Sequence, residues 1–224
     1  MGKASPGPQR DLFARHPAGR LYPIVDSDVC AAAGRAPEDV AQAFLAAGAA
    51  VLQLRCKHLP SGAFLELANR VNEHARTAGA SLFINDRADI AAISGAHGLH
   101  VGQDDLRPLD ARSVIGQAAV LGLSTHTKDQ WDAAVLEPVS YVAIGPAFAT
   151  GTKETGYSAV GLTTISAAAA VAASRGLPTV AIGGITLENA VSVIASGAAA
   201  VAVISDLLKG DPEARCRAFL RSLE

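Results

Sequence analysis

Two carboxylates that follow apolar segments are the residues of this chain best suited to chemistry. The apolar run Leu82–Ile84 ends in Asn85-Asp86, and Asp105 comes nineteen positions after Asp86, behind a second apolar segment. Short apolar runs predict buried strands, and parallel α/β folds bind ligands where such strands end. Two carboxylates from neighbouring strand ends can hold a divalent cation such as Mg2+, which prefers oxygen ligands and binds beside phosphates. Taken separately, Asn85-Asp86 could be a helix N-cap and Asp105 part of a loop.

A second polar cluster is suited to an anion. The segment Gln53-Leu54-Arg55-Cys56-Lys57 alternates polar and apolar residues, so Gln53, Arg55 and Lys57 are expected to point to the same side of a strand. Cations directed into a barrel are costly unless an anion meets them, and both Arg and Lys bind phosphate oxygens. The segment therefore predicts a phosphate site, with a solvated strand end as the alternative. Cys56 is expected to face away from this site and is not predicted to be a nucleophile.

Further phosphate ligands follow later apolar runs. Gly183-Gly184 and Ile204-Ser205 come after the seventh and eighth runs, where barrels recurrently bind phosphate through backbone N–H groups and a helix N-terminus. A Gly-Gly pair is a weak signal by itself, and its place in the strand order strengthens it.

The loop of residues 145–153 carries hydroxyl groups, a glycine and a cation. It contains Thr150, Thr152 and Lys153. We expect a lid that brings Lys153 to a phosphate and excludes water, with a solvated loop as the alternative.

These residues are separated by alternating strand-like and helix-like segments. Eight apolar runs predict strands, at residues 21–25, 50–54, 81–84, 98–101, 120–123, 141–144, 179–182 and 200–203. Helical periodicity marks the intervening segments, among them residues 38–47, 63–78 and 187–196. Eight such units at this length predict an α/β protein with a single (β/α)8 TIM barrel. A doubly wound open sheet is the rival, but no glycine-rich turn follows the first run.

Composition narrows the function further. The 224 residues are 50% hydrophobic and 4% aromatic, with a formal net charge of -2. A nucleic-acid binder would usually show a basic excess, and no apolar run reaches the length of a membrane span. Three widely spaced cysteines form neither a metal motif nor a disulfide framework, so we expect a reduced, cytoplasmic protein. Residues 1–20 are polar and rich in proline, and are expected to be a disordered leader before a barrel domain at 21–224.

Seven motifs in register resemble the thiamine-phosphate synthase family. They extend over about residues 21–208 and are Gln-Leu-Arg-x-Lys at 53–57, Ile-Asn-Asp-Arg at 84–87, Gly-Leu-His-Val-Gly-Gln-x-Asp at 98–105, Gly-Leu-Ser-Thr-His-Thr at 122–127, Gly-Pro-x-Phe-x-Thr-x-Thr-Lys at 145–153, Ala-Ile-Gly-Gly-Ile at 181–185 and Val-Ile-Ser at 203–205. The resemblance implies a (β/α)8 transferase of thiamine biosynthesis. Such an enzyme joins 4-amino-2-methyl-5-hydroxymethylpyrimidine diphosphate to hydroxyethylthiazole phosphate, and releases thiamine phosphate and diphosphate by a dissociative, Mg2+-assisted mechanism.

The resemblance also implies roles for individual residues, with Mg2+ as the cofactor. Asp86 and Asp105 are expected to hold the metal. The pyrimidine diphosphate is expected to bind Gln53, Arg55, Lys57, Asn85, Ser124 and Lys153, of which Arg55, Lys57, Ser124 and Lys153 are the catalytic residues. The thiazole phosphate is expected to bind Thr150, Thr152, Gly183, Gly184, Ile204 and Ser205.

Two other functions fit part of this pattern. A related thiazole tautomerase would use His126 as its acid-base group and leave the carboxylate pair idle; packing or local hydrogen bonding is the favoured reading of this histidine. A non-catalytic binder of thiamine precursors or sugar phosphates would keep the glycine site and have little use for paired carboxylates. The partners expected are the two small-molecule substrates, neither nucleic acid nor membrane, and a homo-oligomer is possible.

Overall fold

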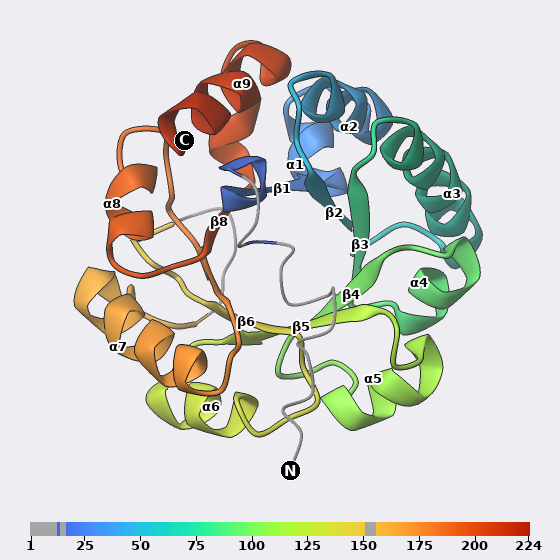
Figure 1. Cartoon of the computed structure of the whole chain (residues 1–224). Coiled ribbons are helices and arrows are strands. Elements are labelled where there is room, and N and C mark those ends of the chain that lie inside the picture. The colour runs from blue at the N-terminus through green and yellow to red at the C-terminus, as the bar shows by residue number, and fades with distance from the viewer. Residues whose placement is uncertain (1–12, 14–16, 151–155) are drawn as a thin grey trace.

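A computed structural model of the chain describes residues 13, 17–150 and 156–224. In this part, eight parallel strands close into a barrel in which each strand pairs with the next and β8 pairs with β1 (Figure 1). The strands are β1 Leu21–Asp26, β2 Val51–Arg55, β3 Ser81–Asn85, β4 Gly98–Val101, β5 Val120–Thr125, β6 Tyr141–Ile144, β7 Thr179–Ile182 and β8 Ala200–Val203. This confirms the (β/α)8 barrel.

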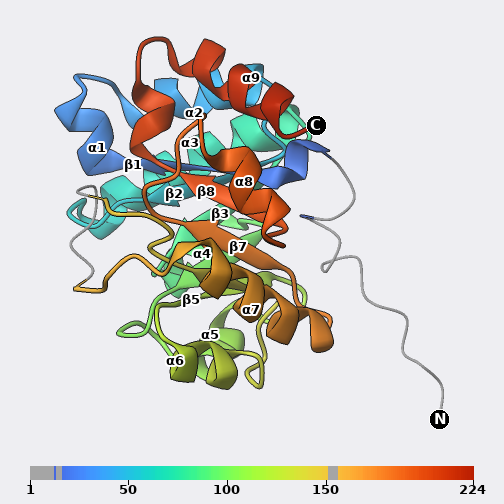
Figure 2. The same ribbon diagram turned by 90° about the vertical axis from the view of Figure 1, so that its left-hand side faces the viewer.

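Helices surround the barrel and follow the strands in order. They are α1 Ser27–Ala32, α2 Pro37–Ala46, α3 Ser61–Thr77, α4 Ala88–Ser94, α5 Pro108–Ile115, α6 Lys128–Ala134, α7 Gly161–Ser174, α8 Ala190–Ala195 and α9 Pro212–Ser222, with short 3-10 helices η2 Pro17–Arg20 and η3 Ser205–Leu208. Figure 2 shows α7 and α8 on the outside of β7 and β8. Within the described residues, no helix is both long and apolar enough to span a membrane.

Alternation along the strands divides the core in two. One set of strand side chains packs against the helices in a largely aliphatic core. The other set fills the barrel itself and contains the rings of Tyr22, Phe83 and Tyr141, because successive strand residues face opposite sides. A Cβ at Gly122 would lie 2.1 Å from Cζ of Tyr141. The missing side chain at this inward position of β5 therefore makes room for the Tyr141 ring.

The predicted strands are confirmed, but several extend further than the apolar runs. β3 includes Asn85 and β5 includes Thr125, while β2 ends at Arg55, so Lys57 lies beyond the strand whose alternation was expected to orient it. The helix predicted at residues 187–196 begins only at Ala190, because Thr186–Asn189 form a turn closed by the Asn189 side chain.

Most of the expected leader lies outside the described residues. Within it, η2 runs from Pro17 to Arg20, and the Phe13 ring is buried in the barrel, with its centroid 5.1 Å from that of Tyr141 and 5.6 Å from that of Tyr22. The boundary between leader and barrel domain stays a prediction.

Candidate active site

Three adjoining cavities lie at the carboxyl ends of the strands. One of about 120 Å³ is lined by the segments after β5 to β8, and one of about 230 Å³ by the segments after β2 to β5. A small cavity of about 20 Å³ inside the barrel shares lining residues with both of them. Ser124 lines all three cavities, so the two larger spaces meet beside its side chain.

The larger cavity contains the predicted carboxylate pair. Asp86 and Asp105 both line it, together with Lys57 and Asn85. Asp86 has a φ of 62°, a left-handed conformation that is uncommon outside glycine and tolerated by Asp. Its backbone N–H donates to the carbonyl of His100 at 2.8 Å, which ties the end of β3 to β4. The sharp turn places the carboxylate in the cavity rather than at the start of α4, so Asp86 is not a helix N-cap; the residue in that place is Arg87.

The two carboxylates influence each other's ionisation. Burial, and then the hydrogen bond with Asp105, raise the pKa of Asp86 above its usual value. Burial would raise the pKa of Asp105 as well, but the interaction with Asp86 and the 2.8 Å bond from the Gly102 N–H outweigh it and lower this pKa. Lys57 forms an ion pair with Asp86, which lowers the pKa of Asp86 and offsets part of the increase. Two neighbouring carboxylates repel each other when both are ionised, and a divalent cation bound to both would relieve this repulsion.

The pair fits Mg2+ in donor chemistry. Mg2+ commonly takes one or two protein carboxylates and completes its shell with water and substrate phosphates. In the described part of the chain no cluster of three or more His, Cys, Asp or Glu side chains could hold a metal. Asp86 and Asp105 are two carboxylates that could hold Mg2+ here.

Arg55 is partly buried and lines the small cavity inside the barrel. Its guanidinium forms an ion pair with the Asp26 carboxylate, which also accepts from the backbone N–H groups of Asp28 and Val29 at the start of α1. Among the described groups, its buried Nε has no hydrogen-bond partner. An unsatisfied buried cationic N–H is costly unless a ligand meets it, which favours an anion at this position.

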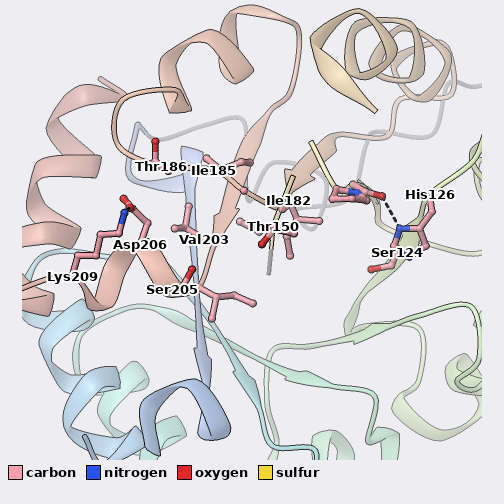
Figure 3. A pocket seen from close by; sticks show the side chains of 16 residues that line it. Ser124, His126, Thr150, Ile182, Ile185, Thr186, Val203, Ser205, Asp206 and Lys209 are labelled. Carbon is pink, nitrogen blue, oxygen red and sulfur yellow. Dashed lines mark hydrogen bonds and ion pairs between the residues drawn. The ribbon is translucent and has the colours of Figure 1, made fainter. Parts of the chain in front are cut away.

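The cavity of about 120 Å³, after β5 to β8, has the features of a phosphate site. Gly183 and Gly184 adopt φ values of 98° and 64°, and a Cβ on Gly184 would lie 2.7 Å from the carbonyl oxygen of Ala149. Thr150 and Ser205 lie between Ser124 on one side and Lys209 on the other (Figure 3). The two glycines therefore let the turn after β7 pack closely against the segment after β6, where a side chain would collide with it.

The segment that carries Ser205 is fixed by Asp206, whose side chain is 3% exposed. Its carboxylate accepts from the Leu187 N–H at 3.1 Å and pairs with Arg215 at 2.6 Å and with Lys209 at 2.7 Å. Burial would raise the pKa of Asp206, but the bonds from Lys209 and Arg215 outweigh it and lower the pKa.

His126 is engaged locally. Its Nδ1 lies 2.6 Å from the carbonyl oxygen of Gly145, and its ring stacks on Tyr157 with centroids 4.3 Å apart. Both rings line the larger cavity. These contacts agree with the favoured structural role of His126, which stays a prediction because the side chain also lines both larger cavities.

The cysteines are not placed for catalysis. Cys30, Cys56 and Cys216 are all buried and free, and burial raises the pKa of Cys56 to about 12. A thiol with such a pKa is a poor nucleophile near neutral pH.

Comparison with known proteins agrees with this geometry. Residues 21–207 match the family described as thiamine monophosphate synthase. The thiamine-phosphate synthase of Koribacter versatilis is 43% identical over 211 residues, which cover 91% of this chain and 95% of the relative. The chain belongs to the thiamine monophosphate synthase family. Among other family members, the thiamine-phosphate synthase of Roseiflexus castenholzii is 40% identical over 204 residues, covering 91% of this chain and 88% of its own length.

Solved structures share the fold of this family member. A thiamine phosphate pyrophosphorylase from Pyrococcus furiosus superposes with a TM-score of 0.81 at 24% identity and covers 96% of both chains. A 3-hexulose-6-phosphate synthase has a TM-score of 0.63 at 14% identity, covering 91% of this chain and 99% of its own. At these identities the likeness concerns the barrel alone.

The structure brings most of the residues predicted for this synthase family to the cavities. Those that line them are Gln53, Arg55, Lys57, Asn85, Asp86, Asp105, Ser124, Thr150, Gly183, Gly184, Ile204 and Ser205. Thr152 and Lys153 lie outside the described residues. The roles assigned to all these residues stay predictions.

Sequence reasoning missed several cavity residues. His100, Tyr157, Thr186 and Lys209 line the cavities and were not singled out. His100 stands within the motif at residues 98–105, and its inward position on β4 could have been read from strand alternation. The position of Tyr157 depends on a loop, for which no such pattern exists.

Proposed function

We propose that this protein is a thiamine-phosphate synthase that joins the pyrimidine diphosphate to the thiazole phosphate. The observation that carries the proposal is the meeting of two chemically different cavities at Ser124. One is lined by a cation and a carboxylate pair and suits a diphosphate with its metal. The other is lined by Gly183, Gly184 and Ser205 and suits a monophosphate.

Arg55, Lys57 and Lys153 would stabilise the diphosphate as it leaves. The bond between the pyrimidine methylene carbon and the diphosphate oxygen breaks, and its electron pair leaves with the diphosphate. Positive charge fixed in advance at that oxygen lowers the barrier because it interacts most strongly when the negative charge has developed. The electron-rich aminopyrimidine delocalises the cation left behind, which makes a dissociative path plausible in chemical terms.

Asp86 and Asp105 would hold Mg2+ beside the diphosphate. Bound there, Mg2+ neutralises part of the charge that develops on the leaving group. Lys57 pairs with Asp86 in the protein alone, and its ammonium would turn to the diphosphate when the metal takes up the carboxylate.

The second half of the reaction requires orientation rather than a base. The thiazole nitrogen attacks the methylene carbon and forms a C–N bond, and it carries no proton to lose. The cavity lined by Gly183 and Gly184 would hold the thiazole phosphate so that the thiazole nitrogen faces the pyrimidine beside Ser124. This explains why the site works without a His-carboxylate pair, with His126 engaged by Gly145 and Tyr157.

The test is diphosphate release by the purified protein given both substrates, first with Mg2+ and then with EDTA. We expect release that needs both substrates and the metal. A protein that isomerises the thiazole phosphate and releases no diphosphate would instead be a tautomerase, and one that binds it without any turnover would be a binding protein. A cytoplasmic location and a homo-oligomeric state stay predictions.

A further inference from the structure

A chain of buried hydrogen bonds runs through the barrel to the junction of the cavities. Gln53 Nε2 donates to the Tyr22 hydroxyl at 3.0 Å, and the hydroxyls of Tyr22 and Tyr141 are 3.2 Å apart. The Tyr141 hydroxyl lies 2.8 Å from His100 Nδ1, and His100 Nε2 lies 2.8 Å from Ser124 Oγ. The side chains of Gln53, Tyr22, Tyr141 and His100 are each at most 7% exposed.

In this series of hydrogen bonds, every donor meets an acceptor when each residue donates to the next, from Gln53 towards Ser124. The Tyr22 oxygen accepts from Gln53, so its proton goes to Tyr141, its remaining partner in the chain. Tyr141 then accepts from Tyr22 and donates to His100 Nδ1. An Nδ1 that accepts leaves the proton of the neutral imidazole on Nε2. The reverse direction would leave the Tyr22 proton pointing at a donor, which is costly in a buried site.

Ser124 therefore receives a hydrogen bond from His100 and keeps its own proton for a ligand. It acts as a donor at the junction of the cavities. One of the two Nε2 protons of Gln53 goes to Tyr22, and the carbonyl oxygen of Gln53 is an acceptor for a ligand in the inner cavity that Gln53 and Ser124 both line. One donor and one acceptor match the edge of a 4-aminopyrimidine, which offers a ring nitrogen as acceptor and an exocyclic amino group as donor.

We propose that Tyr22, Tyr141 and His100 are positioning residues that fix Ser124 as a donor, and so select 4-aminopyrimidine over 4-oxopyrimidine phosphates. A 4-oxopyrimidine carries a carbonyl and a ring N–H at the same edge, so its donor and acceptor are exchanged. The exchanged edge could still donate to the Ser124 oxygen and accept from the second Nε2 proton of Gln53, but the Ser124 proton and the Gln53 carbonyl oxygen would then be left unpaired. Two unpaired buried groups disfavour the 4-oxopyrimidine. This inference rests on the proposed synthase function and adds the means by which the pyrimidine is chosen.

Aromatic packing and burial hold the side chains of this hydrogen-bond series in place. The phenol rings of Tyr22 and Tyr141 lie edge to face with Phe83, at centroid distances of 5.5 and 6.2 Å, and His100 stacks on Tyr141 at 5.6 Å. Burial raises the pKa of both phenols well above the usual value. Both hydroxyls therefore stay protonated, and can donate, near neutral pH.

The experiment compares inhibition by the monophosphate esters of 4-amino- and 4-oxo-2-methyl-5-hydroxymethylpyrimidine. Neither carries the diphosphate leaving group, so their inhibition constants report binding. The variants are Tyr141→Phe and Tyr22→Phe, which break the chain, and Phe83→Leu, which disturbs the same aromatic packing and breaks no link. We expect the preference for the amino ester to fall about tenfold or more when the chain is broken, and to stay as in the wild type in Phe83→Leu.

Nitrogen-15 NMR of the histidine side chains measures which ring nitrogen of His100 carries the proton. A change in packing alone would not alter this tautomer. With the His100 signals assigned by a His100→Gln variant, the wild-type protein should carry its proton on Nε2. In Tyr141→Phe both tautomers lose one partner, so we expect a mixture.

Three results would overturn the inference. They are a wild-type His100 protonated on Nδ1, an unchanged preference in a folded Tyr141→Phe variant, or an equal loss of preference in Phe83→Leu. If Tyr141→Phe does not fold, the wild-type tautomer and Tyr22→Phe still decide. A wild-type protein that makes no thiamine phosphate would defeat the proposed function and this inference with it, whereas an active wild type with an unchanged preference would defeat this inference alone.

Discussion

At the residue scale, the site balances its own charges before substrate arrives. Arg55 is paired with Asp26 and Lys57 with Asp86. Buried or half-buried charges need such partners to be tolerated. In the proposed mechanism the same cations would turn to the diphosphate, because its oxygens offer more negative charge than one carboxylate does.

Replacing Asp86 tests the proposed Mg2+ site. Asp86→Asn removes one charge from the carboxylate pair, and we expect kcat to fall about a hundredfold or more, about 3 kcal/mol in the barrier. The measurement is diphosphate release against Mg2+ concentration. Asp89→Asn is the matched control, since Asp89 pairs with Arg87 on α4 outside the cavities. Equal Mg2+ dependence in Asp86→Asn and the wild type would exclude the assigned ligand.

Replacing Lys57 should affect the chemical step. In Lys57→Met the leaving diphosphate loses one cation, and we expect kcat to fall about a hundredfold. Single-turnover kinetics with the pyrimidine diphosphate saturating would isolate the step. Lys128→Met, which removes an exposed lysine paired with Asp132, should leave the rate unaltered. Full turnover in Lys57→Met would remove this lysine from the mechanism.

At the scale of elements, short connections after the strands decide which groups line the cavities. The turn after β7 approaches the segment after β6 so closely that Gly184 has no room for a side chain. η3 after β8 is held by Asp206, which joins it to α9 through Arg215 and to the turn before α8 through Leu187. The phosphate cavity thus depends on contacts between three successive units of the barrel.

Gly184→Ala should damage the thiazole phosphate site selectively. The new Cβ would lie 2.7 Å from the Ala149 oxygen and at a left-handed φ of 64°, so the loop must shift. We expect KM for the thiazole phosphate to rise about tenfold or more, with KM for the pyrimidine diphosphate little changed. Gly79→Ala, where a Cβ meets nothing within 4 Å at a similar φ, controls for backbone strain. A uniform rise in both KM values would contradict the division of the cavities.

Asp206→Asn should lower stability by an amount that stays constant from pH 7 to pH 5 and shrinks only in stronger acid. The pKa of Asp206 is lowered in the folded protein, so its contribution is fully present above the unfolded value of about 3.9 and is lost as the pH falls below that through the folded pKa. We expect a loss of about 2 kcal/mol at pH 7, measured by urea unfolding, and the same difference at pH 5. A difference that shrinks between pH 7 and pH 5 would contradict this assignment.

At the scale of the whole molecule, the inner aromatic cluster links the two ends of the barrel. Phe13 packs on Tyr22 and Tyr141, whose hydroxyls begin the chain that reaches Ser124. A residue distant in sequence from the site thus supports its floor.

Phe13→Ala should destabilise the barrel. The ring is 3% exposed, and removing a buried phenylalanine costs about 3 kcal/mol or more. Urea unfolding measures the effect, with Leu136→Ala as the control, since Leu136 is 68% exposed and its loss should change stability by about 0.5 kcal/mol or less. Equal midpoints for wild type and Phe13→Ala would show that the ring leaves the barrel in solution.

The sequence by itself determined the barrel and most of the cavity lining. Apolar runs of strand length, separated by helical periodicity, are local patterns, because strand alternation and helix repeat depend only on the order of residues. The same alternation placed Gln53 and Arg55 inside the barrel. The motif order then indicated the family.

Only the tertiary structure decided which groups meet. The ion pair of Arg55 with Asp26, the packing of His126 on Tyr157 and the chain from Gln53 to Ser124 join residues from different strands and loops. No local pattern fixes such pairs, because they depend on closure of the barrel and on the exact path of its loops. The direction of the hydrogen bonds at Ser124 follows from the whole series of partners, which exists only once the five strands β1, β2, β4, β5 and β6 have assembled.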